Sequence, residues 1–521
     1  MKLPDYINYR FNLKMRITMK RLLYILFTLP LCLNAQNMYN ISSIFDNDLA
    51  GTARYVGMGG SMSALGADLS TMATNPAGTA MYRSNDFAFT AGLNVKTNKA
   101  NYEGRVTTSD KLNAFVGNSA MLFSMNYDGD WLKFLNFGLG YRYKNNLTGE
   151  FEMSGASNGY SQQFVMRQLY NDSPFDFNNL TSWHYTDFGS NWLPLLAADA
   201  WLGNGNDFIT YPGDSLVWPP SDLAYYEETR GGVHVIDFNL SANIMDRLYL
   251  GATVSVSNVD YNRYSAYREL DDVGAIYTLE NNLMLKGTGY DLKLGAIYRP
   301  FEYSPFKVGV SVHTPTLYYL KEYSWAAITD PDYKTFSTVD SERYGTELFN
   351  TTRLSSPWRF NASMSYTFDT YLALNAEYEF AGYSTAEFKG REYVPLAQNE
   401  EIKYNLKSQH TARLGAEINV EGVAVRVGYN YITSPFKRDA YKEMGNASVA
   451  ETSTDYMNRY EKNIVTCGFG FRGKSLYFDV AYMMEAQKAD FYPFYDTEYA
   501  NPAAKVDCIN HTAMATVGMR F

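Results

Sequence analysis

The feature that most constrains this chain is a repeated alternation of apolar and polar residues over segments of about 10–13 residues. In the C-terminal segment "TAMATVGMRF" (512–521), every second residue from Ala513 to Phe521 is apolar, and those between are mostly small or polar. The segments "VAVRVGYNY" (423–431) and "LYFDVAYMM" (476–484) alternate in the same way. Such alternation predicts strands with one apolar and one polar face.

A soluble sandwich would turn the apolar face inward, whereas a membrane barrel would turn it outward to lipid. The segments approach the ~9–11 residues that a tilted strand needs to cross a bilayer, and none reaches the ~18 consecutive apolar residues of a membrane helix. Short and long connections alternate along the chain, as in outer-membrane barrels. We therefore expect an all-β fold, a transmembrane antiparallel β-barrel of fourteen strands. The expected strands are 86–97, 117–127, 134–144, 232–245, 248–261, 284–299, 305–318, 356–368, 371–381, 405–420, 423–433, 461–473, 475–486 and 510–521.

Many glycines fall on the polar face of these strands. A soluble core would be left with voids at so many glycines, whereas a barrel lumen can fill the space with a plug, water or ligand. The glycines expected to point inward are Gly92, Gly138, Gly140, Gly251, Gly295, Gly309, Gly415, Gly428, Gly468, Gly470 and Gly518.

The N-terminus predicts export. Residues 19–35, "MKRLLYILFTLPLCLNA", combine two positive charges, a short apolar run and a final Ala, which is typical of a signal peptide. We expect cleavage after Ala35, with residues 1–18 as extra upstream sequence. This cleavage removes six basic residues and one acidic residue, so the remaining chain has a net charge near −15. Such a charge argues against nucleic-acid binding.

No catalytic, metal or cofactor site is expected. The five His are scattered without ligand spacing, and the two cysteines that follow the leader, Cys467 and Cys508, are too few for a disulfide framework. "GASNG" (155–159) has the spacing of a nucleophile elbow but falls in an external loop, where that turn cannot work. We expect no enzyme, although an outer-membrane lipid enzyme is a third, weaker option.

Residues 36–85 precede the first strand and are rich in small residues. "GMGG" (57–60) has no leading strand, so a nucleotide-binding loop is not expected. The segment is either a disordered leader or, as we favour, a hatch folded into the lumen, because small residues pack closely and "NPAG" (75–78) is suited to a turn. The residues expected to shape this hatch are Gly57, Gly59, Gly60, Asn75, Pro76 and Ala77.

Charged residues of both signs fall on the inward face near the expected periplasmic end. Confined charges should pair, because an unpaired buried charge is costly. They form either a structural lumen network or a docking ring for the hatch. The residues are Glu377, Glu417, Arg426, Arg472 and Asp479.

The connection 145–231 is a large insertion expected outside the membrane. It holds four of the seven Trp, and its segment "WLPLLAADAWL" (192–202) reads as a short apolar helix. Exposed apolar surface would mark substrate capture, but a long loop also needs a small core of its own. The candidates for hydrophobic capture are Trp183, Trp192, Leu195, Leu196 and Trp201.

Several segments together resemble the FadL/TodX family of outer-membrane transporters for hydrophobic compounds. They are "GADLSTMATNPAGTAMY" (66–82) leading into the first strand, "ARLGAEI" (412–418) with "VRVGYNYITSPF" (425–436), "CGFGFRGKSLYFDVAYMM" (467–484), and the terminal Phe521 expected to be read by barrel-assembly machinery. The resemblance covers most of the chain after the leader, and the large insertion is its main departure.

The resemblance implies passive uptake of long-chain fatty acids or other hydrophobic compounds across the outer membrane of a Gram-negative bacterium. External loops would capture the compound, and the hatch would release it. Family members let the compound leave sideways, beside a kink in the third strand, for which Gly138 and Gly140 are candidates because glycine weakens strand packing. The alternative is a shuttle or anchoring component of protein export, with a protein partner on the loops. Hydrophobic small molecules and membrane lipid are the other expected partners.

Overall fold

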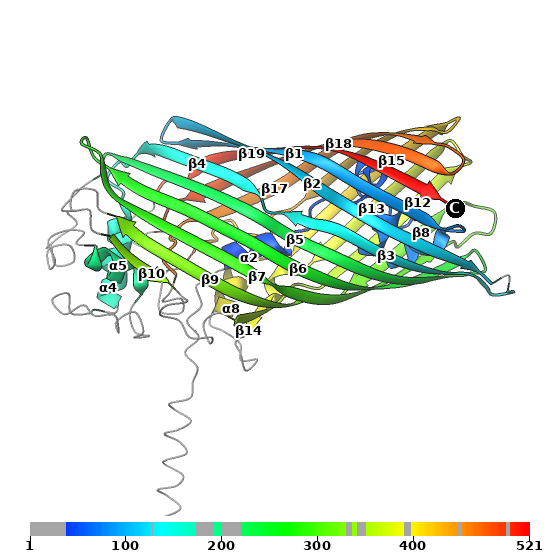
Figure 1. Ribbon diagram of the computed structural model, residues 1–521, viewed down its shortest axis with the longest axis horizontal. Helices are drawn as coiled ribbons and strands as arrows, with labels where there is room; N and C mark the ends of the chain where they lie inside the picture. The colour runs from blue at the N-terminus through cyan, green and yellow to red at the C-terminus, as the bar shows by residue number, and fades with distance from the viewer. Residues whose placement is uncertain are drawn as a thin grey trace, which may run out of the picture.

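The computed structural model describes residues 38–127, 129–172, 174, 191–200, 220–329, 336–340, 351–389, 398–442, 444, 451–495 and 501–521. Fourteen antiparallel strands form a ring, and β19 closes on β1 with Arg520 opposite Asp86 (Figure 1). This confirms the predicted fold class and strand number. In ring order the strands are β1 (Asp86–Tyr102), β2 (Arg105–Asn126), β3 (Leu132–Asn146), β5 (Asp222–Ile244), β6 (Leu248–Leu270), β7 (Ala275–Tyr298), β8 (Lys307–His313), β12 (Arg359–Phe368), β13 (Leu372–Ala381), β15 (Gln409–Val420), β16 (Val423–Ile432), β17 (Tyr456–Arg472), β18 (Leu476–Tyr492) and β19 (Ala504–Arg520). The predicted signal peptide, residues 1–35, lies outside the described residues.

Several strands run far beyond the lengths expected from the sequence. β5, β6 and β7 have 23, 23 and 24 residues. β1 and β2 are joined by the two-residue turn Glu103–Gly104, and β6 and β7 by a four-residue turn at 271–274. The expected strands left long loops at 98–116 and 262–283, and both of these predicted loops are therefore wrong. Backbone pairing continues beyond the membrane, where the outward residues of the strands are mostly polar and the alternation that marks a membrane strand is lost.

Short strands extend the wall at the same end. β4 (Gly149–Ala156) pairs with β5, and β9 (Leu317–Thr329) pairs with β7. β10 (Phe336–Asp340) and β11 (Thr351–Ser355) pair with β9, and β14 (Glu387–Lys389) pairs with β11. The barrel is thus taller on the side of β5–β7 than a membrane requires.

The outer face of the ring carries an exposed apolar belt, with Phe137 and Leu139 on β3 and Leu414 and Ile418 on β15 as examples. The edge of this belt nearer the long strands is marked by tyrosines. The hydroxyl of each tyrosine forms a hydrogen bond with a polar side chain of the adjoining strand. In each case that side chain lies two residues from the residue directly opposite the tyrosine. The pairs are Tyr141–His234 at 2.9 Å, Tyr378–His410 at 2.6 Å, Tyr429–Asn463 at 2.7 Å and Tyr482–His511 at 2.7 Å. Such a belt with an aromatic edge is the exterior of an outer-membrane barrel.

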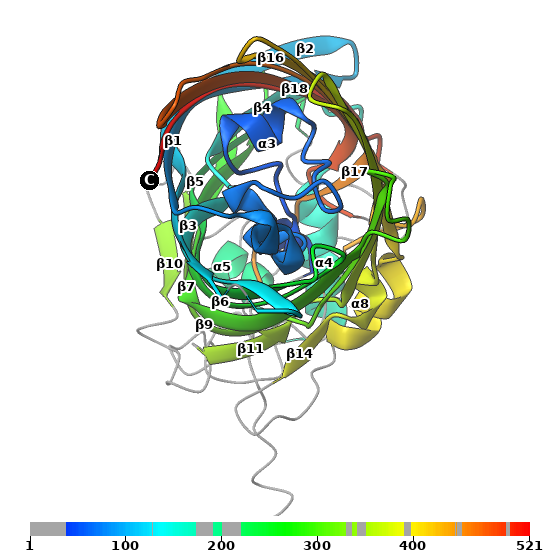
Figure 2. The same ribbon diagram turned by 90° about the vertical axis from the view of Figure 1, so that its right-hand side faces the viewer.

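The lumen is filled from both ends. The N-terminal segment lies inside the ring (Figure 2) and forms α2 (Met38–Phe45), α3 (Ala53–Gly57), η1 (Leu69–Ala73) and η2 (Pro76–Met81). At the end with the long strands lie α4 (Gln162–Asp172) and α5 (Trp192–Asp199), while η5 (Tyr383–Thr385) and α8 (Gln398–Asn405) follow β13 (Figure 1). Among the residues described, no helix is long and apolar enough to cross a membrane.

The position of the belt can be tested with charge on one strand. Leu414→Arg places a cation in the middle of the belt on β15 and should lower the free energy of unfolding by about 2–4 kcal/mol, whereas His410→Arg at its edge should cost about 0–1 kcal/mol. Denaturant titration of the barrel in lipid vesicles measures both. Equal costs would contradict the placement of the membrane boundary.

Candidate functional site

The hatch is built from short helical turns with side-chain caps. Thr52 accepts a hydrogen bond from the backbone N–H of Tyr55 at the start of α3, and its hydroxyl donates to Asp68, which caps η1. Asn75 caps η2, with Pro76 at the first position of the turn, where proline's missing N–H costs nothing. The predicted turn at 75–78 is thus the start of a helical turn, and it is held by the Asn75 amide donating to the carbonyl of Ser63 at 2.9 Å.

The glycines of the hatch lie against the inward glycines of the wall. A Cβ on Gly57 would be 3.2 Å from the Cα of Gly468. A Cβ on Gly428 would overlap the backbone nitrogen of Gly59, whose φ of +64° itself favours glycine. Gly60 also has positive φ, at +71°. The backbone of the hatch therefore packs directly on the backbone of the wall, which explains why both are rich in glycine.

The turn at Asn75–Ala77 lies on the opposite part of the wall. A Cβ on Gly251 would overlap the backbone of Pro76 and Ala77, and one on Gly295 would overlap the Asn75 amide. Five of the six predicted hatch residues thus contact the inner wall, whereas Gly60 lies against Leu49 and Tyr55 of the hatch itself.

A buried ion pair fixes the hatch to β15, and its carboxylate also belongs to a chain of ion pairs with β16 and β18. Arg54 of α3 donates two hydrogen bonds to Glu417, both at 3.0 Å, and one to the carbonyl of Ala67 at 2.8 Å. Arg426 lies between Glu417 and Asp479, at 2.5 and 2.6 Å, and its side chain is fully buried. Removing one partner from such a group leaves an uncompensated buried charge and costs about 3–5 kcal/mol.

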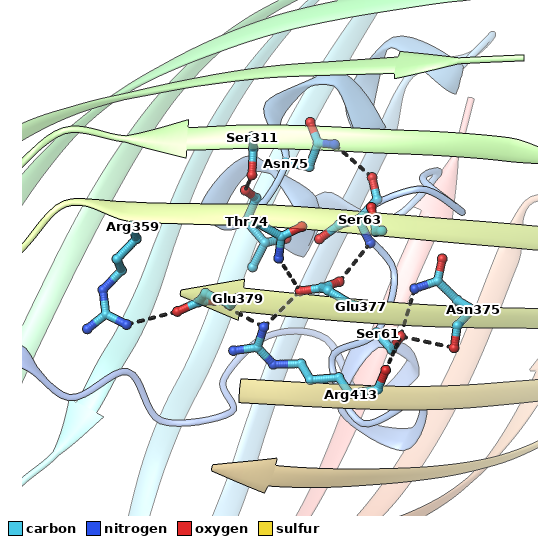
Figure 3. Close-up of polar contacts among 12 residues, drawn as sticks. Ser61, Ser63, Thr74, Asn75, Ser311, Arg359, Asn375, Glu377, Glu379 and Arg413 are labelled. Carbon is cyan, nitrogen blue, oxygen red and sulfur yellow. Dashed lines mark hydrogen bonds and ion pairs between the residues drawn. The ribbon is translucent and has the colours of Figure 1, made fainter. Parts of the chain in front are cut away.

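A second group holds the middle of the hatch (Figure 3). Glu377 accepts from Arg413 at 2.8 Å and from the backbone N–H of Ser63 at 3.3 Å. Arg413 also pairs with Glu379, which in turn pairs with Arg359 at 2.8 Å. The charges of these two groups pair with one another, and Glu417 and Glu377 also bond the hatch.

Of the five predicted network residues, Glu417, Arg426 and Asp479 are joined in the first group, Glu377 lies in the second, and Arg472 is in neither. No ion pair of Arg472 to a described residue is formed; its guanidinium lies 5.8 Å from the ring of Tyr477. The sequence reasoning missed Arg413, Glu379 and Arg359, although each lies on an inward-facing position of its strand. Arg54 carried no such signal, because the hatch has no strand periodicity.

The wall has an interruption beside the third strand. Pairing between β2 and β3 ends at Asn118 opposite Arg142, beyond which β2 pairs only with β1, and β3 and β4 only with β5. Gly138 and Gly140 lie within the regular part, and the register of β3 shifts at Tyr143–Asn145 instead. The irregularity is therefore not at the two predicted glycines.

At this seam, side chains take the place of the backbone ladder. Ser109 on β2 donates to the carbonyl of Glu150 on β4 at 2.9 Å, and Lys111 pairs with Glu150 at 3.3 Å and with Glu228 on β5 at 2.6 Å. Closer to the end of the β2–β3 pairing, the ring centroids of Phe115 and Tyr143 lie 6.1 Å apart. The inner face of β2 thus overlaps the outer face of the neighbouring strands, and the seam is closed by contacts that can separate without breaking a strand pair.

The outer mouth is closed by the described part of the insertion. Trp192, Leu195 and Leu196 of α5 are buried, in a cluster with α4 and with inward residues at the outer ends of β4–β7 and β18. Glu269 of β6 accepts the backbone N–H of Gln162 at the start of α4, at 2.6 Å. These three candidates for substrate capture therefore pack the loop instead of presenting an apolar surface. Trp183 and Trp201 lie outside the described residues.

Between the hatch and this cap, the lumen has two different walls. One side borders a cavity of about 160 Å³ with charged lining that includes Lys96, Lys462, Glu485 and Asp48. The other side is apolar, with inward Val235, Leu285 and Leu320 among others, and α2 lies against it.

No protein-family model and no curated protein sequence matches the chain. Solved structures do match. A Pseudomonas aeruginosa FadL homologue aligns with a TM-score of 0.53 at 12% identity, over 91% of this chain and 99% of its own. The chain has the fold of the FadL-type channels. The P. putida toluene transporter TodX aligns with a TM-score of 0.50 at 13% identity, and a TodX monoaromatic hydrocarbon channel mutant with 0.52 at 13%, covering 91% of this chain and 99% and 100% of theirs.

Close packing of the hatch on the wall predicts sensitivity to a single methyl group. Gly428→Ala forces its Cβ into the backbone of Gly59 and should destabilise the docked hatch by about 1–3 kcal/mol. The measurement is amide hydrogen exchange over residues 53–62, which should become faster.

The matched control is Gly140→Ala, also under the hatch, whose Cβ would make ordinary contacts at 3.5 Å with Ala120 and Met72. Equal exchange in the two variants would show that the hatch is not docked through these glycines.

Proposed function

We propose that this protein is an outer-membrane channel for the passive passage of hydrophobic compounds, such as long-chain fatty acids or aromatic hydrocarbons. The observation that carries the proposal is the seam between β2 and β3–β4 in a barrel whose two ends are both filled. A compound that reaches the lumen of such a barrel has a sideways route out, at the outer edge of the apolar belt, that breaks no backbone ladder.

The shared fold supports this proposal, because the TodX structures are those of a toluene transporter and a monoaromatic hydrocarbon channel. The apolar inner wall of β5–β9 supports it as well, since a hydrophobic compound needs a surface to replace the water it leaves.

The second candidate is a shuttle or anchor in protein export. It is favoured by the projection of β5, β6 and β7, whose 23, 23 and 24 residues exceed the ~9–11 needed to cross a bilayer. Such a projection offers a large surface to a protein partner outside the membrane.

Bridging the seam tests the channel. In a background with Cys467→Ser and Cys508→Ser, the pair Lys111→Cys and Glu150→Cys is joined by a short bis-maleimide on cells that express the protein. Uptake of radiolabelled oleate and toluene should fall to the level of cells without the protein, because the overlapping strands can no longer separate.

The control pair is Lys488→Cys with Asp507→Cys, which lie opposite each other on β18 and β19, where the ladder is intact. Bridging it should leave uptake unchanged. Full uptake through the bridged seam would refute the sideways route. No uptake by any variant, with a protein co-purifying on the outer loops, would favour the export candidate.

A further inference from the structure

The outer face of the barrel has a pocket directly beyond the apolar belt, at the outer ends of β15, β16 and β17. On β16 the side chains of Val427 and Tyr429 are exposed in the belt, and Tyr429 is one of the tyrosines that mark its edge. Tyr431, two residues farther out, is also exposed and lines the pocket together with Thr433. The pocket has a volume of about 200 Å³. It therefore opens at the level where the acyl chains of the outer leaflet give way to headgroups.

The lining of this pocket is strongly basic. Its charged residues among those described are Lys407, Lys437, Arg438, Arg459 and Glu461. Arg459 lies 3.7 Å from Asp46 of the N-terminal segment, on the side of the lumen. Lys407 and Arg438 are exposed and form no ion pair with a described residue. Asp439 is exposed next to Arg438 in the sequence but is not part of the lining.

Two connected loops hold these cations at the pocket. The backbone N–H of Lys407, before β15, donates to the carbonyl of Pro435 at 2.8 Å. The backbone N–H of Lys437, after β16, donates to the carbonyl of Asn405 at 2.8 Å. Phe436, between Pro435 and Lys437, is buried. The backbone that carries the cations is thus fixed before any ligand binds, so less order has to be gained on binding.

On the next strands round the barrel, cations beyond the belt lie next to carboxylates. Lys488 of β18 and Lys99 of β1 are each directly opposite Asp507 of β19. Lys505 of β19 pairs with Asp490 of β18 at 2.8 Å. Cations that are grouped with too few carboxylates repel one another, and a bound anion removes that repulsion. The basic pocket is therefore suited to an anionic ligand in a way that the neighbouring surface is not.

We propose that this basic pocket binds the phosphate group of a phosphorylated glycolipid in the outer leaflet of the membrane. Lys407 and Arg438 contact the phosphate, to which a guanidinium offers parallel N–H donors and an ammonium a compact charge. Tyr431 lies on the membrane side of the pocket, against the part of the glycolipid that joins its headgroup to its acyl chains. The belt below the pocket contacts those acyl chains, which favours a lipid over a soluble phosphate. The site does not depend on the proposed channel function.

The test is native mass spectrometry of the full barrel, released from nanodiscs of phosphatidylcholine with increasing amounts of bis-phosphorylated lipid A. The variant Lys407→Gln with Arg438→Gln should bind lipid A about 25-fold more weakly, because each cation near an anionic membrane surface contributes about a factor of five. Lys407→Arg with Arg438→Lys keeps both charges and should bind nearly as the unchanged protein does. Resistance of each barrel to unfolding in detergent confirms that it is folded.

The matched control is Lys99→Gln with Lys488→Gln, which removes the same charge on both sides of Asp507 and should leave binding unchanged. Lipid A without its phosphates should bind equally weakly to the unchanged protein and to Lys407→Gln with Arg438→Gln. Inorganic phosphate at the same concentration as lipid A should not displace it, because the lipid is also held by the belt.

Equal binding of lipid A by the unchanged protein and by Lys407→Gln with Arg438→Gln would overturn the inference, as would an equal loss in the control variant. Displacement of lipid A by inorganic phosphate at the same concentration would overturn the assignment to a lipid. The bridged seam concerns other residues and is measured by uptake, so failure of either proposal leaves the other standing.

Discussion

The whole molecule depends on the pairing of its last strand with its first. In the hydrocarbon layer no water is present to satisfy backbone N–H and C=O groups, so a sheet is stable there only if it closes on itself. Pairing from Arg520 opposite Asp86 to Lys505 opposite Asn101 provides that closure. Once the ring is closed, its alternating residues are divided between lipid and lumen, and the inner face must be filled or solvated.

The inner face of the barrel is filled in a different way in each half of the lumen. Near the short turns, wall and hatch approach through glycines, and one buried ion pair, Arg54 with Glu417, crosses the contact. Burying a charge is tolerable only with such partners. Nearer the outer mouth the wall is apolar, and it is covered by α2 and by the packed helices of the insertion. The inner contact is specific and strongly held, whereas α2 is held mainly by apolar surface.

Strand periodicity predicted much of this from sequence. A period of two assigns each side chain to lipid or lumen, so Glu377, Glu417, Arg426 and Asp479 were expected on the inner face, where the structure pairs them with other charges. The same rule would have found Arg413 and Glu379. It failed for Arg472, because direction alone does not say whether a partner is within reach. It also failed for the hairpin of β1 and β2, where paired backbone continues through residues that do not keep an apolar outer face.

The sequence by itself determined the ring, its number of strands and the face that each strand turns to lipid, because these follow from a local repeat and from the absence of any other way to satisfy a backbone in a membrane. Only the tertiary structure decided which residues meet inside. Arg54 and Glu417 are separated by 363 residues, and Tyr39 and Phe436 are also remote in sequence. Tertiary structure also decided that Trp192 is buried in a cap and that the wall is interrupted between β2 and β3. Such contacts depend on how the closed wall positions distant segments in space, and no local pattern records that.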